Sequence, residues 1–173
     1  YRDAFTRYVG IDPMLASDTE LQKRVPETIG KMRDDCLDYL LTTYIEPHLG
    51  KEGCTVLAYY PPTQAALAKT RPMDGVTMAE RFEVYRKGIE LANGYHELQD
   101  AKEQRKRLNE SNLLRQLLGK DTLPIDERFL AALESEKGLP ECSGVAVGFD
   151  RLMMLRQEAK TISEVIAFSW QQA

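Results

Sequence analysis

The stretch that decides the fold runs from residue 81 to residue 100 and reads RFEVYRKGIELANGYHELQD. Apolar and polar residues alternate on either side of Lys87-Gly88, a pair suited to a tight two-residue turn. Alternation of this kind is typical of strands, whose successive side chains point to opposite faces. The stretch therefore predicts a β-hairpin that turns at Lys87-Gly88, and with it an antiparallel sheet.

Three glutamates, Glu83, Glu90 and Glu97, recur in this hairpin at an interval of seven residues. The predicted register places Tyr85 opposite Glu90 and Glu83 opposite Ala92, with these four side chains on one sheet face. Two carboxylates placed diagonally on one face repel each other unless a cation or a basic ligand lies between them. The hairpin therefore indicates a site for a positively charged group.

Composition limits the classes of protein to which the chain can belong. The chain has 173 residues, of which 43% are hydrophobic and 29% are charged, which suits one ordinary domain with a real core. A net charge of −4 gives no overall attraction for nucleic acid or an anionic membrane. The three cysteines are widely spaced and are expected to be reduced cytoplasmic thiols. No apolar run approaches the roughly 20 residues of a membrane span, and the start at Tyr1, without Met, suggests a fragment.

The first fifty residues predict helices. Residues 1–9 have apolar side chains at helical spacing, and Ser17 or Asp18 is a suitable cap for a short helix that ends near residue 25. A longer helix is predicted to begin at Pro26 and to continue to about residue 45. His48 follows this helix and is interpreted as structural, because no orienting partner for catalysis is visible.

Strand and helix signals alternate further along the chain. Residues 54–61, CTVLAYYP, predict a strand buried on both faces, and residues 69–78 predict a surface loop. Residues 101–118 predict a charged amphipathic helix, with leucines 108, 114 and 117 toward the core. Its basic residues are alternatively a contact for an acidic partner. Asp126 is predicted to cap another helix.

The second informative stretch runs from residue 142 to residue 168 and reads CSGVAVGFDRLMMLRQEAKTISEVIAF. Residues 144–148, GVAVG, predict a strand of small residues to whose backbone another group can come close. A helix is predicted from Asp150 or the residue before it, anchored by Leu152, Met153 and Leu155. Arg151 lies in its first turn, where the helix dipole repels cations, so we expect an anionic partner such as a carboxylate or phosphate.

Together, the hairpin acids and Arg151 suggest a polyphosphate held through a divalent metal ion. The sequence contains neither a Walker motif nor a G-x-G-x-x-G fingerprint, which disfavours the familiar parallel-sheet nucleotide folds. Simpler interpretations stay open at this point. The acids could form ion pairs with Arg81, Arg86 or Lys87 on a solvated face, and the glycines could serve only close packing.

Resemblance to a known family adds more. GVAVGFDRLMML resembles motif 3 of class II aminoacyl-tRNA synthetases, and GIELANGYHELQDAKEQRKRL resembles the adjoining hairpin of lysyl-tRNA synthetases. The forms ELANG, HEL and GLPECSGVAVG are most similar to a shortened paralogous family, the elongation factor P lysine lysyltransferases. The similarity is strong over residues 81–173 and fainter over 1–80, where TVLAYYPPTQAALAK resembles the strand that precedes the hairpin. Motifs 1 and 2 of the family are absent.

The implied fold is α+β, namely the C-terminal portion of one class II synthetase-like catalytic domain with a mainly antiparallel sheet flanked by helices. Residues 1–50 would be a helical segment, and residues 51–173 the sheet core with motif 3. The resemblance implies a cytoplasmic enzyme. It also implies a homodimer through the missing motif 1, and an inactive isolated fragment because the motif 2 arginine is missing.

The resemblance also implies roles for individual residues. The ATP site would consist of Glu83, Glu90, Leu91, Gly148 and Arg151. Within it, Glu83 and Glu90 would hold Mg²⁺ and Arg151 would contact the γ-phosphate, so that Glu90 and Arg151 carry the catalytic roles. The Leu91 backbone would lie beside the nucleotide, and Gly148 would leave room for it.

The amino-acid pocket would be lined by Asn93, Glu97 and Ala146, with Glu97 paired to the side-chain ammonium of the substrate. Strict alternation places Glu97 on the wrong face, and a bulge at Asn93-Gly94 would correct this, because one extra residue changes the parity. Ala146 stands where synthetases usually have glycine, as does Ala92 before Asn93-Gly94. The Ala146 methyl group should disfavour α-lysine and suit (R)-β-lysine, the substrate of the shortened family.

The implied function is ATP-dependent activation of lysine or (R)-β-lysine as an aminoacyl-adenylate, followed by transfer to a lysine side chain of elongation factor P. The implied cofactors are ATP and Mg²⁺, and tRNA is not expected as a partner. Two alternatives remain: a true lysyl-tRNA synthetase with an anticodon-binding domain upstream, or a non-catalytic synthetase-like binding domain. His96 is expected to face away from the pocket.

Overall fold

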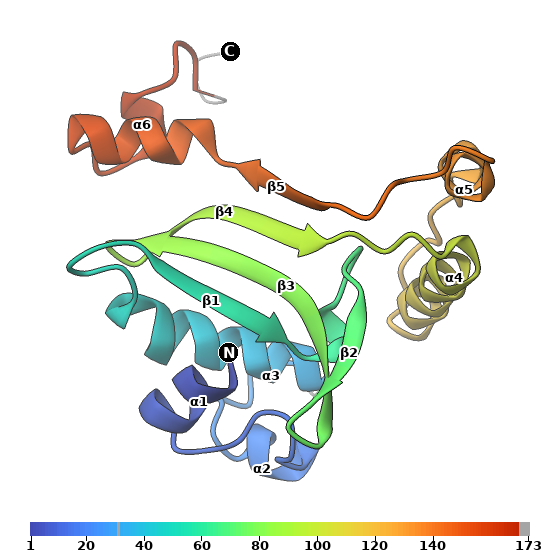
Figure 1. Ribbon diagram of the computed structural model, residues 1–173. Coiled ribbons are helices and arrows are strands. Elements are labelled where there is room, and N and C mark those ends of the chain that lie inside the picture. Colours follow the sequence, from blue (N-terminus) through green and yellow to red (C-terminus); the bar gives the residue numbers. More distant parts are fainter. Residues whose placement is uncertain (31, 170–173) are drawn as a thin grey trace.

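The computed structural model describes residues 1–30 and 32–169. Three helices open the chain: α1 (Arg2–Tyr8), α2 (Asp18–Gln22) and α3 (Arg33–Leu40). Figure 1 shows them together under the strands β1 and β3. Ser17 caps α2 as predicted, because its hydroxyl accepts from the Glu20 amide while the Glu20 carboxylate accepts from the Ser17 amide.

The predicted long helix from Pro26 is wrong in extent, because α3 begins only at Arg33. It continues as a π-helical turn, η1 (Leu41–Ile45), and a 3₁₀ turn, η2 (Glu46–His48). The wider π turn shifts the phase of the apolar stripe by one position. Ile45 is fully buried as a result, whereas Tyr44, which an unbroken α-helix would place on the apolar side with Leu37 and Leu41, is 45% exposed.

The sheet is antiparallel and has the strand order β1-β3-β4-β5, with β2 paired to β3. This confirms the predicted architecture of an antiparallel sheet flanked by helices. The strands are β1 (Thr55–Tyr60), β2 (Thr70–Met73), β3 (Val76–Arg86), β4 (Ile89–His96) and β5 (Ser143–Val147).

Two predictions about strands are wrong. The expected surface loop at residues 69–78 contains β2 and a tight turn at Asp74-Gly75, where both residues have positive φ (52° and 79°). Asp-Gly is a typical hairpin turn, and Pro72 is tolerated because β2 pairs on one side only. Strand β1 is not buried on both faces either, since Val56 is 59% exposed.

The remaining elements lie around the ends of the sheet (Figure 1). They are the 3₁₀ turns η3 (Pro62–Gln64) and η4 (Ile162–Glu164), and the helices α4 (Ala101–Leu117), α5 (Glu127–Glu134) and α6 (Phe149–Gln157). Asp126 caps α5 as predicted, by accepting from the Phe129 amide. The predicted anchors of α4 and α6 are wrong in part. Leu108, Met153 and Leu155 are half-buried, but Leu114, Leu117 and Leu152 are exposed, and the buried residues of these helices include Gln104 and Met154.

The core lies between the N-terminal helices and one half of the sheet. Apolar side chains from α1, α3 and η1 pack there against β1 and β3, among them Phe5, Leu37, Leu40, Ile45 and Leu57. Strand β5 receives no such cover within the described residues, and most of its side chains are exposed. No helix in the part of the chain that the structure describes is long and apolar enough to cross a membrane.

Candidate functional site

The β3–β4 hairpin turns at Lys87-Gly88 as predicted, with positive φ at both residues (52° and 75°). Tyr85 lies opposite Glu90, also as predicted. The register then shifts, and Glu83 lies opposite Asn93 instead of Ala92. The prediction for Ala92 is therefore wrong, and its side chain projects from the other face beside Val84.

The cause of the shift is one extra residue, Leu91, in β4. The predicted bulge exists, but it lies at Leu91 and not at Asn93-Gly94. It changes the parity of the strand, so Asn93 and Glu97 fall on the same face as Glu83. The Leu91 carbonyl accepts a hydrogen bond from the Gly148 amide at 2.8 Å, which joins the bulge to the end of β5.

One row of side chains crosses four strands: Leu57 on β1, Glu83 on β3, Asn93 on β4 and Ala146 on β5. Directly opposed residues in antiparallel strands project to the same side. We call this side the site face. The helices cover it over β1 and β3 and leave it uncovered over β5, so the face has a covered half and an open half.

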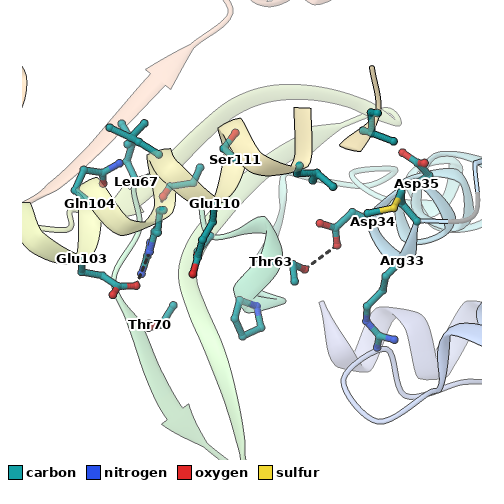
Figure 2. Close-up of a pocket in the computed structure, with 18 residues that line it drawn as sticks. Arg33, Asp34, Asp35, Thr63, Leu67, Thr70, Glu103, Gln104, Glu110 and Ser111 are labelled. Atoms are coloured by element: carbon teal, nitrogen blue, oxygen red, sulfur yellow. Dashed lines mark hydrogen bonds and ion pairs between the residues drawn. The ribbon is translucent and has the colours of Figure 1, made fainter. Parts of the chain in front are cut away.

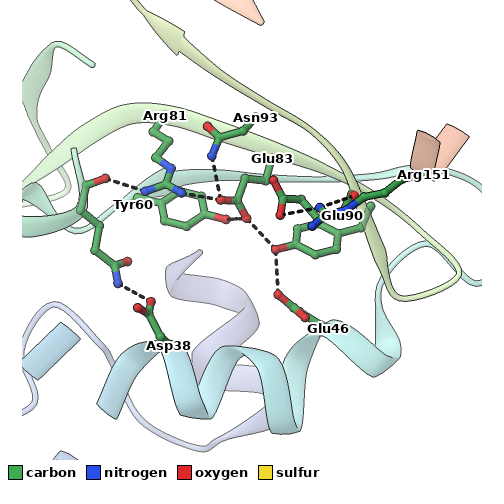
Figure 3. A network of polar contacts seen from close by, with 10 residues as sticks. Asp38, Glu46, Tyr60, Arg81, Glu83, Glu90, Asn93 and Arg151 are labelled. Carbon is green, nitrogen blue, oxygen red and sulfur yellow. Dashed lines mark hydrogen bonds and ion pairs between the residues drawn. The ribbon is translucent and has the colours of Figure 1, made fainter. Parts of the chain in front are cut away.

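The covered half is centred on Glu83, which is only 5% exposed (Figure 3). Its Oε2 accepts from the Tyr60 hydroxyl at 2.5 Å and from the Tyr85 hydroxyl at 2.6 Å. Its Oε1 accepts from Arg81 at 2.5 Å and from Asn93 Nδ2 at 3.2 Å. All four acceptor positions of the carboxylate are thus occupied.

Burial and charge reinforce this network. Burial raises the pKa of the Tyr60 and Tyr85 hydroxyls well above the usual value, and the neighbouring Glu83 carboxylate raises both further. Both hydroxyls therefore stay protonated as donors. The Arg81 guanidinium also lies over the Tyr60 ring, 4.5 Å from its centroid. The network holds the Glu83 carboxylate and the Arg81 guanidinium in fixed positions.

Glu90 and Arg151 meet beside this network (Figure 3). Arg151 Nη1 lies 3.0 Å from Glu90 Oε2 and also donates to the Glu90 carbonyl oxygen at 2.9 Å. The anionic partner expected for an arginine at the start of α6 is thus a carboxylate in this structure. The second oxygen, Glu90 Oε1, makes no hydrogen bond to any described residue.

The open half is centred on Glu97, whose carboxylate has no hydrogen bond or ion pair with the described residues. It lies over Gly144, where a Cβ atom would come within 2.3 Å of Glu97 Oε1. Asn93 Oδ1 is buried and likewise has no hydrogen-bond partner in the described structure. Ala146 and Gly148 are exposed on the same side. The Glu97 carboxylate therefore lies over a shelf of small residues on β5, and Asn93, which carries the second acceptor, lies opposite Ala146 of this shelf.

Comparisons with known proteins agree with this geometry. A family model described as tRNA synthetases class II (D, K and N) matches residues 22–172. The chain belongs to this family. Proteins named elongation factor P–(R)-β-lysine ligase are similar to it over nearly its whole length.

Such a protein from Klebsiella pneumoniae (strain 342) is 48% identical over 98% of the chain, and one from Proteus mirabilis (strain HI4320) is 49% identical over 97%. One from Haemophilus influenzae (strain PittGG) is 46% identical over 98% of the chain. The chain spans about half the length of these curated relatives (53%). As a ligase-like class II synthetase domain, it belongs to a family that generally uses ATP and Mg²⁺.

The two histidines lie away from the open half. The ring of His48 stacks on Tyr8, with centroids 4.7 Å apart. His96 lies between two carboxylates, with Nδ1 2.8 Å from Glu80 and Nε2 3.2 Å from Glu141. Because His96 is the last residue of β4 and directly precedes Glu97, alternation directs its side chain to the opposite face.

A separate cleft of about 740 Å³ lies between α3, η3 and α4 (Figure 2). Thr63, Glu103 and Gln104 are among its lining residues, and Thr63 donates a hydrogen bond to Asp34 at 2.7 Å. None of the predicted site residues lines this cleft. It therefore contributes nothing to the geometry of the site face.

Sequence reasoning missed four residues of the site. Alternation placed Tyr85 on the face of Glu83, yet its donor role did not follow from that. Tyr60 binds Glu83 because β1 packs beside β3, for which the sequence gives no signal. Arg81 lies two residues before Glu83 on β3, and the sequence suggested it only as an ion-pair partner on a solvated face, not as part of a buried network. Glu46 was also missed: its Oε1 lies 3.1 Å from the Tyr85 hydroxyl, and it comes from η2 after the unforeseen π turn.

Proposed function

We propose that this chain carries the amino-acid and ATP sites of an enzyme that activates lysine or (R)-β-lysine and transfers it to a lysine of elongation factor P. One observation supports this above all. Among the described residues, the Glu97 carboxylate and Asn93 Oδ1 are acceptors without partners, and Glu97 lies over Gly144 while Asn93 lies opposite Ala146 on β5. A substrate ammonium would supply the missing donors, because it carries three N–H groups and a positive charge.

Ala146 would set the choice between the two lysines. It lies in the same row as Asn93, so its methyl group projects into the space where the backbone part of the substrate would lie. Glycine at this position would leave more room. We therefore propose (R)-β-lysine, whose amino group is shifted by one carbon, as the preferred substrate, in line with the names of the relatives.

Mg²⁺ would be held by Glu90 and Glu83. The Glu90 carboxylate fits a divalent cation, because one of its oxygens is unpaired within the described structure and its side chain is 32% exposed. Glu83 Oε2 accepts hydrogen bonds from two hydroxyls, so Glu83 can bind the cation once one of these donors turns away. When bound, Mg²⁺ would neutralise charge on the phosphates of ATP.

The residues of this chain would then divide the remaining work. Arg151 would move from Glu90 to the γ-phosphate, because a guanidinium binds carboxylates and phosphates with the same planar fork. The Leu91 backbone and Gly148 would lie beside the nucleotide. The substrate carboxylate would attack the α-phosphate, releasing pyrophosphate and forming the aminoacyl-adenylate.

The acceptor would be the ε-amino group of a lysine on elongation factor P, as the names of the relatives suggest. An amine nucleophile needs little help from a general base, which suits a site from which both histidines point away. We place the protein in the cytoplasm, which agrees with its three free cysteines. The whole protein would act as a homodimer and would not charge tRNA.

A transfer assay with the full-length protein tests this proposal. Radiolabelled (R)-β-lysine, ATP and Mg²⁺ are incubated with elongation factor P, with a variant of it that lacks the acceptor lysine, or with lysine tRNA. We expect label on unchanged elongation factor P only. Label on tRNA would favour a lysyl-tRNA synthetase, and no label on any acceptor would contradict the transfer activity.

A further inference from the structure

The Tyr85 hydroxyl lies between two carboxylates, although it has only one proton to donate. Its oxygen is 2.6 Å from Glu83 Oε2 and 3.1 Å from Glu46 Oε1. A phenol donates one hydrogen bond at a time, so one carboxylate accepts that bond and the other remains available as a second acceptor. The shorter distance indicates that the Tyr85 hydroxyl donates its hydrogen bond to Glu83 in this structure.

The backbone around Glu46 is fixed in the position that brings its carboxylate close to the Tyr85 hydroxyl. The π turn η1 ends immediately before it, and π turns are rare elements that recur at functional sites. The segment that follows is fixed to the hairpin, because the Gly88 amide donates to the Leu49 carbonyl at 2.9 Å and the Lys87 amide to the Gly50 carbonyl at 2.8 Å. The distance between Glu46 and Tyr85 is therefore set by backbone contacts.

Metal binding creates a need for such a second acceptor. Glu83 has no free acceptor position, yet the proposed metal site requires one of its oxygens. Among the carboxylates of the described residues, Tyr60 donates to Glu83, whereas Tyr85 has a second carboxylate, Glu46, within reach. Rotation of the Tyr85 O–H bond would free Glu83 Oε2 with almost no movement of heavy atoms.

We propose that Glu46 is a positioning residue of the nucleotide site, which accepts the hydrogen bond from the Tyr85 hydroxyl when Glu83 turns to the metal ion. This inference rests on the proposed function, since it assumes that Glu83 and Glu90 hold the metal. The carboxylate environment of Glu46 agrees with this role. Burial raises the pKa of Glu46, and Glu83 and Glu90 raise it further, so a hydrogen-bond donor stabilises its charged form.

Manganese binding to the full-length protein tests this role. The affinity for Mn²⁺ is measured by electron paramagnetic resonance in the presence of a non-hydrolysable ATP analogue, for the unchanged protein and for E46A, E46Q, Y85F and the double variant Y85F/E46A. We expect E46A to bind Mn²⁺ about tenfold more weakly, the usual effect of losing a hydrogen bond to a charged group. E46Q loses the charge but keeps an acceptor, so it should stay within about threefold of the unchanged protein.

The double variant separates this role from a general structural one. Without the Tyr85 hydroxyl, Glu83 Oε2 has a free acceptor position, and Glu46 has no hydrogen bond to accept from residue 85. Y85F should therefore bind Mn²⁺ at least as tightly as the unchanged protein, and Y85F/E46A should match Y85F. The matched control E52A removes an exposed carboxylate from the same segment and should have no effect.

Three results would overturn the inference alone: an unchanged affinity in E46A, an equal loss in E46Q and E46A, or a loss in E46A that persists beside Y85F. Absence of nucleotide-dependent Mn²⁺ binding in the unchanged protein would be a different result. It would overturn the proposed metal site and, with it, the role of Glu46.

Discussion

The covered half and the open half of the site face meet at Asn93 on β4 but satisfy their charges differently. Around Glu83, four donors from four residues occupy every acceptor position of a buried carboxylate. Around Glu97, a carboxylate and an amide oxygen lack any donor in the described structure. The difference teaches that acids at one spacing in a sequence can have different surroundings: the protein itself supplies the donors to Glu83, whereas we propose that a ligand supplies those to Glu97.

The largest effect on activity is expected from a substitution in the open half. Glu97→Ala should abolish lysine-dependent exchange of pyrophosphate with ATP in the full-length protein, because the substrate ammonium loses its counter-charge. A loss of at least about hundredfold is expected for a desolvated ion pair. The matched control Glu134→Ala removes an exposed carboxylate from α5 and should leave the exchange unchanged. Near-normal exchange in Glu97→Ala would remove Glu97 from the pocket.

The next effect breaks the covered half and concerns stability. Glu83→Ala leaves the Tyr60 and Tyr85 hydroxyls and the Arg81 guanidinium buried without their acceptor. We expect a loss of about 3 kcal/mol in the free energy of unfolding, measured on this chain by urea denaturation. Glu110→Ala, which removes an exposed carboxylate instead of a buried one, serves as the control. A loss below about 1 kcal/mol would show that the network contributes little.

A glycine substitution sharpens the comparison further. Gly144→Ala places a methyl group 2.3 Å from Glu97 Oε1, so the side chain of Glu97 must move. Because its far end is flexible, we expect little change in stability but an increase of about tenfold in the KM for lysine. Gly53→Ala is the matched control, since nothing lies within 4 Å of its new methyl group. Equal KM values for the two variants would contradict the proposal that the substrate binds to Glu97 over the small residues of β5.

The smallest effect concerns selectivity. Ala146→Gly should shift the ratio of kcat/KM toward α-lysine and away from (R)-β-lysine by about tenfold, the lower end of what one methyl group in a pocket contributes. The same pyrophosphate exchange assay, run with each substrate, gives this ratio. An unchanged ratio would show that the methyl group on β5 does not contact the part of the substrate that differs.

Much of the fold followed from local signals. The turn at Lys87-Gly88 and the caps at Ser17 and Asp126 depend on nearby residues, and each was predicted correctly. The hairpin at Asp74-Gly75 carried an equally local signal, which the surrounding polar residues obscured.

The remainder depended on tertiary contacts. The bulge at Leu91 was foreseen in kind, but its place is set by the pairing of β4 with both neighbouring strands. The π turn before Glu46 has no local signature, and its extra residue reverses which of Tyr44 and Ile45 is buried. Spacing brought Glu83 and Glu90 together correctly, whereas the saturation of Glu83 required Tyr60 from a distant strand.

Pyrophosphate exchange in the full-length protein with three amino acids tests the central claim most directly, namely that the unpaired acceptors of the open half bind a side-chain ammonium. The substrates are (R)-β-lysine, lysine and norleucine, which has a similar chain without the terminal ammonium. We predict exchange with (R)-β-lysine, weaker exchange with lysine and none above background with norleucine. Equal exchange with norleucine, or no exchange with any of the three, would contradict the account.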